Sequence, residues 1–213
     1  MRLRALSAVA AALIAVVRSA GAQTSELWPE LDVYWQPAEH QRTFLELSAS
    51  AEQEGSKRQA TAGLYQDYLF LPNGYVRGGY RFTFSTHDAS YRESRLVGEW
   101  VERVLSHGMA RLVNRARFEM RWVNGEPSYR IRERLHLQRV PPKPRGLALA
   151  PYGTFEVYYD SRFGAISRLA GRVGTEARLV GPASVDVYVA RQDNLRESPS
   201  YVNALGVTIK LVY

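Results

Sequence analysis

Apolar and polar residues alternate with a period of two along most of this chain. In the segment Arg111–Val123, for example, Phe118 and Met120 lie on one face of an extended chain, and Arg117 and Arg121 lie on the other. Such alternation is typical of a half-buried β-strand, whereas an amphipathic helix repeats every 3.6 residues. The pattern therefore predicts an all-β fold.

Eleven segments carry this alternation, and short clusters rich in glycine, proline and asparagine separate them. Among the breaks, the Asn73-Gly74 pair favours the tight turn of a β-hairpin. Long antiparallel strands joined by successive hairpins predict an up-and-down barrel. The predicted strands are Pro29–Gln36, Thr43–Glu52, Ala60–Leu71, Tyr75–Thr86, Tyr91–Leu105, Arg111–Val123, Tyr129–Val140, Leu147–Asp160, Ala165–Val180, Ser184–Gln192 and Tyr201–Tyr213.

Alternation alone fits two kinds of barrel, which differ in the direction that the apolar face points. A soluble barrel buries its apolar face, whereas a transmembrane barrel turns it toward lipid and encloses the charges. The predicted strands reach the roughly 9–11 residues that a tilted membrane strand needs. Aromatic residues such as Trp35, Trp100 and Tyr129 lie near strand ends, as in interfacial girdles. We therefore expect an antiparallel up-and-down transmembrane β-barrel of 10–12 strands.

Two features are unusual for such a barrel: the odd number of alternating segments, and two acidic residues on the predicted lipid face. Single-chain bacterial barrels have an even number of strands, so ten or twelve are expected. With ten, Thr43–Tyr213 forms the barrel with both ends in the periplasm, and Pro29–Gln36 is a plug, a periplasmic segment or half of an unresolved pair. Glu102 and Glu133 fall on the predicted lipid face, which places them near an interface or beside a bulge.

The first 22 residues have the features of a cleaved signal peptide. Arg2 and Arg4 precede the apolar run Ala5–Val17, and Ala20-Gly21-Ala22 matches a small-x-small cleavage site. The apolar run is shorter than the roughly 20 residues of a transmembrane helix. We therefore expect residues 1–22 to be removed and residues 23–213 to form the barrel of a Gram-negative outer membrane.

Composition narrows the possible chemistry. The chain contains no cysteine, which excludes cysteine nucleophiles, zinc–cysteine sites and redox pairs. Its formal net charge is +7, but Arg2, Arg4 and Arg18 lie in the predicted signal peptide. The remaining arginines are spread along strands rather than clustered, so we expect no nucleic-acid partner. No cofactor or metal site is expected, and the sequence does not define the oligomeric state.

Charged residues concentrate on the face that is predicted to line the interior. The structural explanation is that arginines and carboxylates satisfy one another in a packed interior, since buried charges must be paired. The functional alternative is a narrow pore in which an excess of arginine favours anions. The predicted network comprises Arg77, Arg81, Arg95, Glu99, Arg115, Arg117, Glu119, Arg121, Arg130, Arg132, Arg134, Glu156, Arg172 and Glu176.

The end of the chain resembles the C-terminal recognition strand of bacterial outer-membrane barrels. Val207, Ile209 and Leu211 occupy alternate positions, and Tyr213 supplies the terminal aromatic residue. This resemblance implies that the barrel-assembly machinery reads the strand during biogenesis and that outer-membrane lipids surround the finished barrel.

A set of charged, aromatic and glycine positions recurs along most of Leu27 to Tyr213. These positions are Trp28, Glu30, Arg95, Glu99, Arg115-x-Arg117-x-Glu119, Arg130-x-Arg132-x-Arg134, Glu156, Arg172, Gly174, Tyr188 and Tyr213. In these positions the chain resembles the outer-membrane barrel family catalogued as domain of unknown function 2490. The resemblance implies an outer-membrane location without an established activity.

Two other functions remain open at the level of sequence. A lipid-acting hydrolase would need a serine next to a histidine that an acid orients, and Ser85 with His87 is the candidate pair, without a supporting motif. We therefore predict no catalytic site. His136 is expected to join the arginine network rather than bind a metal, because a lone imidazole is not a coordination set. A soluble periplasmic barrel that binds a hydrophobic ligand would instead need an apolar interior.

Overall fold

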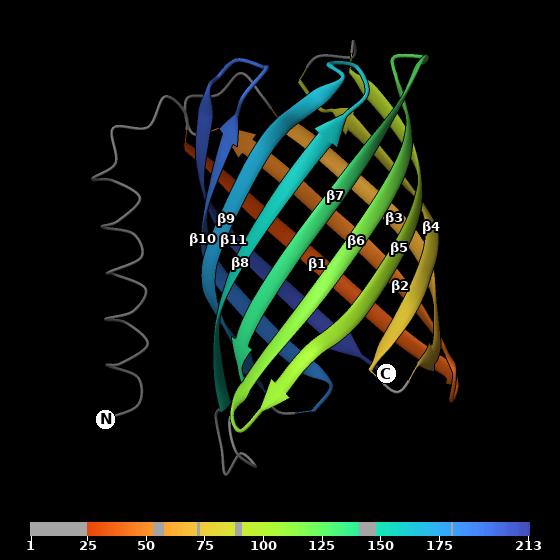
Figure 1. The fold of residues 1–213 in the computed structure, drawn as a ribbon, viewed down its shortest axis with the longest axis vertical. Helices are drawn as coiled ribbons and strands as arrows, with labels where there is room; N and C mark the ends of the chain where they lie inside the picture. Colours follow the sequence, from red (N-terminus) through yellow and green to blue (C-terminus); the bar gives the residue numbers. More distant parts are fainter. Residues whose placement is uncertain (1–24, 53–57, 72, 88–90, 141–147, 180) are drawn as a thin grey trace.

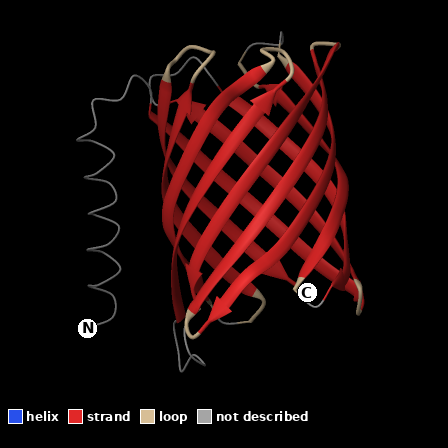
Figure 2. Cartoon of the chain, viewed as in Figure 1, coloured by secondary structure: helices blue, strands red, loops and turns tan. Residues whose placement is uncertain are grey.

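The computed structural model describes residues 25–52, 58–71, 73–87, 91–140, 148–179 and 181–213. These residues form a closed barrel of β-strands joined by turns, without a described helix (Figures 1 and 2). The predicted signal peptide, residues 1–22, lies outside the described residues. The strands are β1 (Ser25–Ala38), β2 (Gln41–Glu52), β3 (Arg58–Leu71), β4 (Gly74–Ser85), β5 (Arg92–His107), β6 (Ala110–Val123), β7 (Glu126–Arg139), β8 (Ala148–Asp160), β9 (Ala165–Arg178), β10 (Ala183–Asn194) and β11 (Tyr201–Val212).

The all-β class and the predominantly antiparallel, up-and-down order are confirmed, because each strand pairs with its neighbour in sequence. Eleven strands close the described barrel, a number within the expected range of 10–12, but the expectation that the number would be even, ten or twelve, is wrong. Closure is made by β1, which pairs in parallel with β11 from Ser25↔Asn203 to Tyr34↔Val212. An odd number requires this arrangement, since the first and last strands then run in the same direction.

The segment that contains Pro29–Gln36 is therefore part of the barrel wall, rather than a plug or a periplasmic segment. Its strand β1 also pairs antiparallel with β2. At the end of the seam, the backbone amide of Tyr213 donates to the carbonyl of Tyr34 at 2.9 Å. The amide of Gln36 donates to the carbonyl of Tyr213 at 3.1 Å, so the last residue completes the closure.

The two rims of the barrel are distinguished by the strand ends that lie there. We call the rim at which β1 begins rim A; it includes the turn Asn124-Gly125. Rim B is the opposite one, at which β11 ends (Figure 1). The turn between β6 and β7 is tight because Asn124 and Gly125 both adopt positive φ, at 53° and 92°. This is the geometry that an Asn-Gly hairpin favours.

The alternation of the sequence separates two chemically different faces. Large apolar side chains cover the outer wall; Leu64 is 59% exposed and Val173 is 65% exposed. Carboxylates and guanidinium groups point inward, and Glu93 and Glu119 are completely buried. The barrel is therefore apolar outside and charged inside.

Two interior tyrosines pack on glycines of their own and neighbouring strands. Tyr188 on β10 lies directly between Gly174 on β9 and Gly206 on β11. A Cβ atom on Gly174 would lie 2.6 Å from Cβ of Tyr188, and one on Gly206 would overlap the ring. Tyr65 lies against Gly63 and Gly79 in the same manner. The missing side chains give each aromatic ring room to lie flat against the inner wall.

The two acidic residues on the outer face occupy different positions. Glu102 pairs with Gly74, the first residue of β4, and therefore lies close to rim B. Glu133 lies in the middle of β7, between Ala116 and Val157 on the neighbouring strands. The pairing of β7 has no register shift there, so Glu133 is neither at a rim nor beside a bulge.

Candidate functional site in the charged interior

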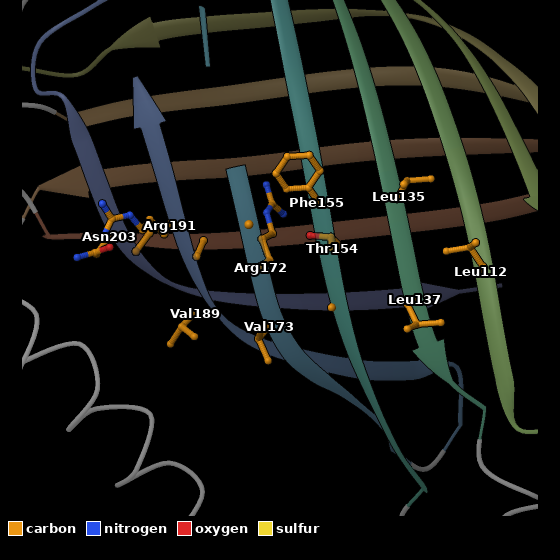
Figure 3. A pocket seen from close by; sticks show the side chains of 14 residues that line it. Leu112, Leu135, Leu137, Thr154, Phe155, Arg172, Val173, Val189, Arg191 and Asn203 are labelled. Carbon is orange, nitrogen blue, oxygen red and sulfur yellow. The ribbon is translucent and has the colours of Figure 1, made fainter. Parts of the chain in front are cut away.

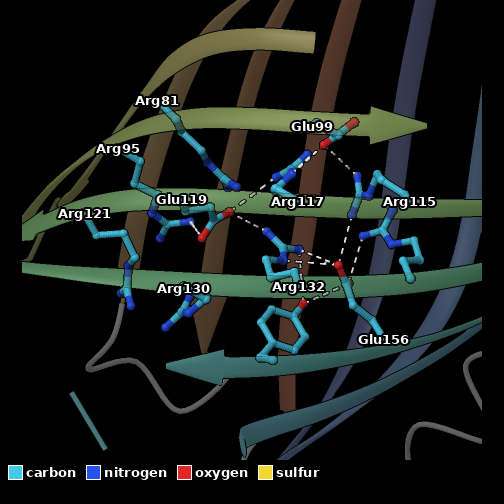
Figure 4. A network of polar contacts seen from close by, with 12 residues as sticks. Arg81, Arg95, Glu99, Arg115, Arg117, Glu119, Arg121, Arg130, Arg132 and Glu156 are labelled. Atoms are coloured by element: carbon cyan, nitrogen blue, oxygen red, sulfur yellow. Dashed lines mark hydrogen bonds and ion pairs between the residues drawn. The ribbon is translucent and has the colours of Figure 1, made fainter. Parts of the chain in front are cut away.

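The middle of the interior is crossed by a chain of ion pairs between β5, β6, β7 and β8 (Figure 4). Arg132 on β7 joins two carboxylates: its Nη1 donates to Glu119 at 2.8 Å and its Nη2 to Glu156 at 2.9 Å. Glu156 also accepts hydrogen bonds from Arg115 and Arg134, each at 3.0 Å. Three guanidinium groups therefore share one carboxylate, which leaves this wall with an excess of positive charge.

A second group of ion pairs lies toward rim A. Glu93 accepts hydrogen bonds from Arg95 at 2.5 Å and from Arg121. Arg121 also donates to Asp160 at 2.7 Å, and Arg130 donates to the same oxygen of Asp160 at 2.8 Å. Asp160 has no exposed surface and ends β8, so it ties the strand end to its neighbours.

A third group lies on the side of β3 and β4. Asp67 accepts hydrogen bonds from Arg42 and Arg77, both at 2.6 Å. The guanidinium of Arg77 also lies 4.4 Å from the ring centroid of Phe44, within the range of a cation–π contact. Glu99 accepts from Arg117 at 2.5 Å. Each of these acids is thus held by at least one arginine from a neighbouring strand.

The register of the strands explains why these side chains meet. Arg117 pairs directly with Glu99 on β5 and with Arg132 on β7, and all three point inward. Arginine suits this environment because its planar fork binds two acceptors at once and keeps its charge. The network therefore follows from alternation plus register, and it fills the space that a narrow barrel encloses.

Among the described residues, the interior contains two chambers that meet near the middle of the barrel. The chamber toward rim A has a volume of about 400 Å³ and the chamber toward rim B about 320 Å³. Both chambers are lined by the same five residues, which therefore form the boundary between them. These residues are Glu30, Arg81, Arg132, Arg172 and Tyr188.

Most of the fourteen residues that the sequence singles out join these groups. Arg81 forms an ion pair with Glu46 at 3.1 Å instead. Arg172 lies over the ring of Tyr188, with 5.0 Å between Cζ and the ring centroid. Glu176 pairs with Lys210 at 2.7 Å, near rim B.

The predicted network lacks the interior acids of β1, Glu30 and Asp32, and Asp160 at the end of β8. The expected ten-strand barrel excludes β1, although the alternation of Leu31, Asp32 and Val33 carries the signal for Asp32. Asp160 ends its strand, where the alternation stops. Asp32 and Asp160 are buried, and their charges reduce the excess of arginine that the sequence suggests.

The outer wall carries an apolar groove with a volume of about 580 Å³ (Figure 3). The groove is hollowed at Gly153 and Gly171 because these residues have no side chain. The space above them is open, since a Cβ atom on either glycine would contact only a backbone oxygen, at 3.9 Å. Phe155 pairs directly with Gly171, and Leu137 and Val173 flank Gly153 on the neighbouring strands (Figure 3). The groove crosses the strands from β6 to β11.

Val207, Ile209 and Leu211 of the C-terminal pattern lie in β11, and Tyr213 follows directly after this strand. Ile209 and Tyr213 are exposed, and Val207 and Leu211 are half-buried. Their reading by an assembly machinery stays a prediction.

The contact between Ser85 and His87 runs through the main chain: the backbone amide of His87 donates to the Ser85 hydroxyl at 3.4 Å. The ring of His136 lies 4.9 Å from that of Tyr152 in the interior. No group of three histidine, aspartate or glutamate side chains among the described residues is placed to hold a metal ion. The described residues also include no helix that is long and apolar enough to cross a membrane.

No protein-family model matches the chain, and no curated protein matches it. The resemblance to the family catalogued as domain of unknown function 2490 therefore stays a prediction from the residues.

Proposed function

We propose that this protein is an integral β-barrel of the outer membrane of a Gram-negative bacterium and that its interior is a narrow, anion-preferring pore. The observation that carries this proposal is the distribution of side chains, apolar on the outer wall and charged inside. In water this arrangement would expose a very large apolar surface, which soluble proteins avoid. In a bilayer the same surface is solvated by acyl chains.

Strand length and aromatic residues support the membrane location. The strands have 12 to 16 residues, more than the roughly 9–11 that a tilted strand needs to cross a bilayer. On the outer wall Tyr129 and Tyr159 stack with ring centroids 6.1 Å apart, close to rim A. Trp35 is 59% exposed near rim B. Such residues favour the interfaces between lipid and water.

The charges around the chamber toward rim A support anion preference. Eight arginines and four glutamates line this chamber, which gives it an excess of positive charge. Rings of arginine raise the local concentration of anions and lower that of cations. The five residues shared by the two chambers keep the passage narrow, so large solutes are expected to be excluded.

Two other functions are supported less well. A soluble barrel that binds a hydrophobic ligand needs an apolar interior, and the described interior is lined by charges instead. A lipid-acting hydrolase would use Ser85 and His87, and a His87→Ala variant that loses lipid hydrolysis would support it.

The proposal is tested by reconstituting the purified protein in planar bilayers under a potassium chloride gradient. We expect small channels whose reversal potential indicates preference for chloride. Arg172→Gln should reduce this preference, because Arg172 lies at the boundary between the chambers. Arg191→Gln, on the outer wall, is the matched control and should leave it unchanged. Cation preference, or the absence of conductance, would contradict the pore.

A further inference from the structure

The charges that line the chamber toward rim B are segregated to opposite walls. On the strands around the closing seam, Glu30 and Asp32 of β1 and Asp186 of β10 line the chamber. Lys210 is the cation on this wall, and it lies 2.7 Å from Glu176 and 3.9 Å from Asp186. One cation thus stands among several carboxylates, which leaves the seam wall with negative charge.

The facing wall has the opposite sign. In the ring of eleven strands, β6 and β7 lie directly across from β1. Arg115 on β6 and Arg134 on β7 line the chamber there, and they share Glu156 with Arg132. Arg115 also lies 3.7 Å from Glu99, which accepts a hydrogen bond from Arg117, so the guanidinium groups on this wall outnumber the carboxylates that they share.

Polar atoms on both walls lack a hydrogen-bond partner among the described residues. On the seam wall these are one oxygen of Asp32 and one of Asp186, whose residues are only 5% and 8% exposed. On the facing wall they include the Nε atoms of Arg115 and Arg134, and one oxygen of Glu99 on the adjacent strand β5 lacks a partner as well. Buried polar atoms without partners cost free energy, so a solute that satisfies both walls at once would be favoured.

We propose that the chamber toward rim B is a binding site for a small zwitterion that carries an ammonium group and a carboxylate. The ammonium group donates hydrogen bonds to Asp32 and Asp186, and the carboxylate accepts them from Arg115 and Arg134. This inference rests on the proposed function, because it requires a water-filled interior that solutes can enter. It adds the class of solute that the interior holds.

The shape and charge of the chamber favour a zwitterion over a simple ion. An anion binds the arginine wall but is repelled by the carboxylates of the seam wall. A cation is attracted by these carboxylates but repelled by the arginines. A volume of about 320 Å³ lies at the lower end of the range of ligand pockets, which suits a compact solute such as an amino acid.

The test measures binding to the whole protein in detergent micelles by titration calorimetry, with 4-aminobutyrate, butyrate and butylamine as probes of similar length. The zwitterion makes charge-assisted contacts with both walls, whereas each single-charge analogue makes them with one wall. We therefore expect the zwitterion to bind at least about tenfold more tightly than either analogue. The double variant Asp32→Asn/Asp186→Asn should lose this advantage. Asp193→Asn, the same chemical change at an exposed position near rim A, should keep it.

Folding of each variant is checked by its mobility on gels with and without heating, which distinguishes closed barrels from unfolded chains. Equal affinity for butyrate and 4-aminobutyrate would overturn the inference, as would absence of binding. An unchanged advantage in the folded double variant would overturn it too. The bilayer measurements test the pore independently of the binding site. Binding without conductance would contradict the pore but not the binding site. Conductance without binding would contradict the binding site but not the pore.

Discussion

The packing of Tyr188 against its two glycines gives the sharpest prediction about stability. Gly206 pairs directly with Tyr188, and a Cβ atom at this position would overlap the tyrosine ring. The ring has little freedom to move away, because Arg172 lies over it and Trp28 and Tyr152 pack against its cluster. Gly206→Ala should therefore force a rearrangement of the inner wall.

The size of the effect follows from the cost of overpacking. Inserting a methyl group into a well-packed interior costs about 1–3 kcal/mol. Against this, replacing glycine by alanine stabilises a chain by about 0.4–1 kcal/mol when the native backbone accepts it, because the unfolded state loses freedom. Gly98→Ala is the matched control, since a Cβ there points outward and meets nothing within 4 Å. The two variants should change stability in opposite directions.

The assay is reversible unfolding of the reconstituted barrel by guanidinium chloride, and it gives the free energy of unfolding of each variant. A double-mutant cycle with Tyr188→Ala isolates the contact. In that background Gly206→Ala should no longer destabilise the barrel. Equal unfolding midpoints for Gly206→Ala and Gly98→Ala would refute the packing argument.

Three further predictions concern the network, a turn and the last residue. Glu119→Gln should destabilise the barrel by about 3 kcal/mol or more, because buried arginines lose their counter-charge. Glu197→Gln, near rim A, is the control and should cost less than about 1 kcal/mol. The same denaturation assay measures both free energies of unfolding, and equal costs would contradict the burial argument. Gly125→Ala should cost about 1 kcal/mol, because alanine is strained at a φ of 92°; an unchanged unfolding midpoint would argue against this turn geometry. Tyr213→Ala should slow accumulation of the folded barrel in cells, measured by pulse-chase and gel mobility, and an unchanged rate would contradict its role in assembly.

Much of the barrel could be predicted from the sequence because the responsible signal is local. The alternation around Phe118 and Arg117 assigns each side chain to a face without knowledge of distant contacts. The Asn124-Gly125 turn likewise follows from the preference of two adjacent residues for positive φ. Once faces and turns are known, antiparallel neighbours bring Arg117 next to Glu99, and the ion pairs follow.

The closure of the barrel could not be predicted in this way. Pairing of β1 with β11 joins the two ends of the described chain, and no local pattern encodes that register or its parallel direction. A barrel that excluded β1 would also leave Asp32 outside the interior. The negative wall of the chamber toward rim B arises only when β1 stands beside β11. The segregation of charge is therefore a property of the closed ring.

The central claim, that the apolar face meets acyl chains and the charged face is enclosed, has a direct test. The chain has no cysteine, so Phe118→Cys and Arg117→Cys each provide a single labelling site on adjacent residues. Each variant is labelled with a small fluorophore and reconstituted in vesicles that contain lipids brominated on the acyl chains, which quench fluorescence on contact. We predict strong quenching at position 118 and little at position 117; strong quenching at position 117 with none at position 118 would contradict the account.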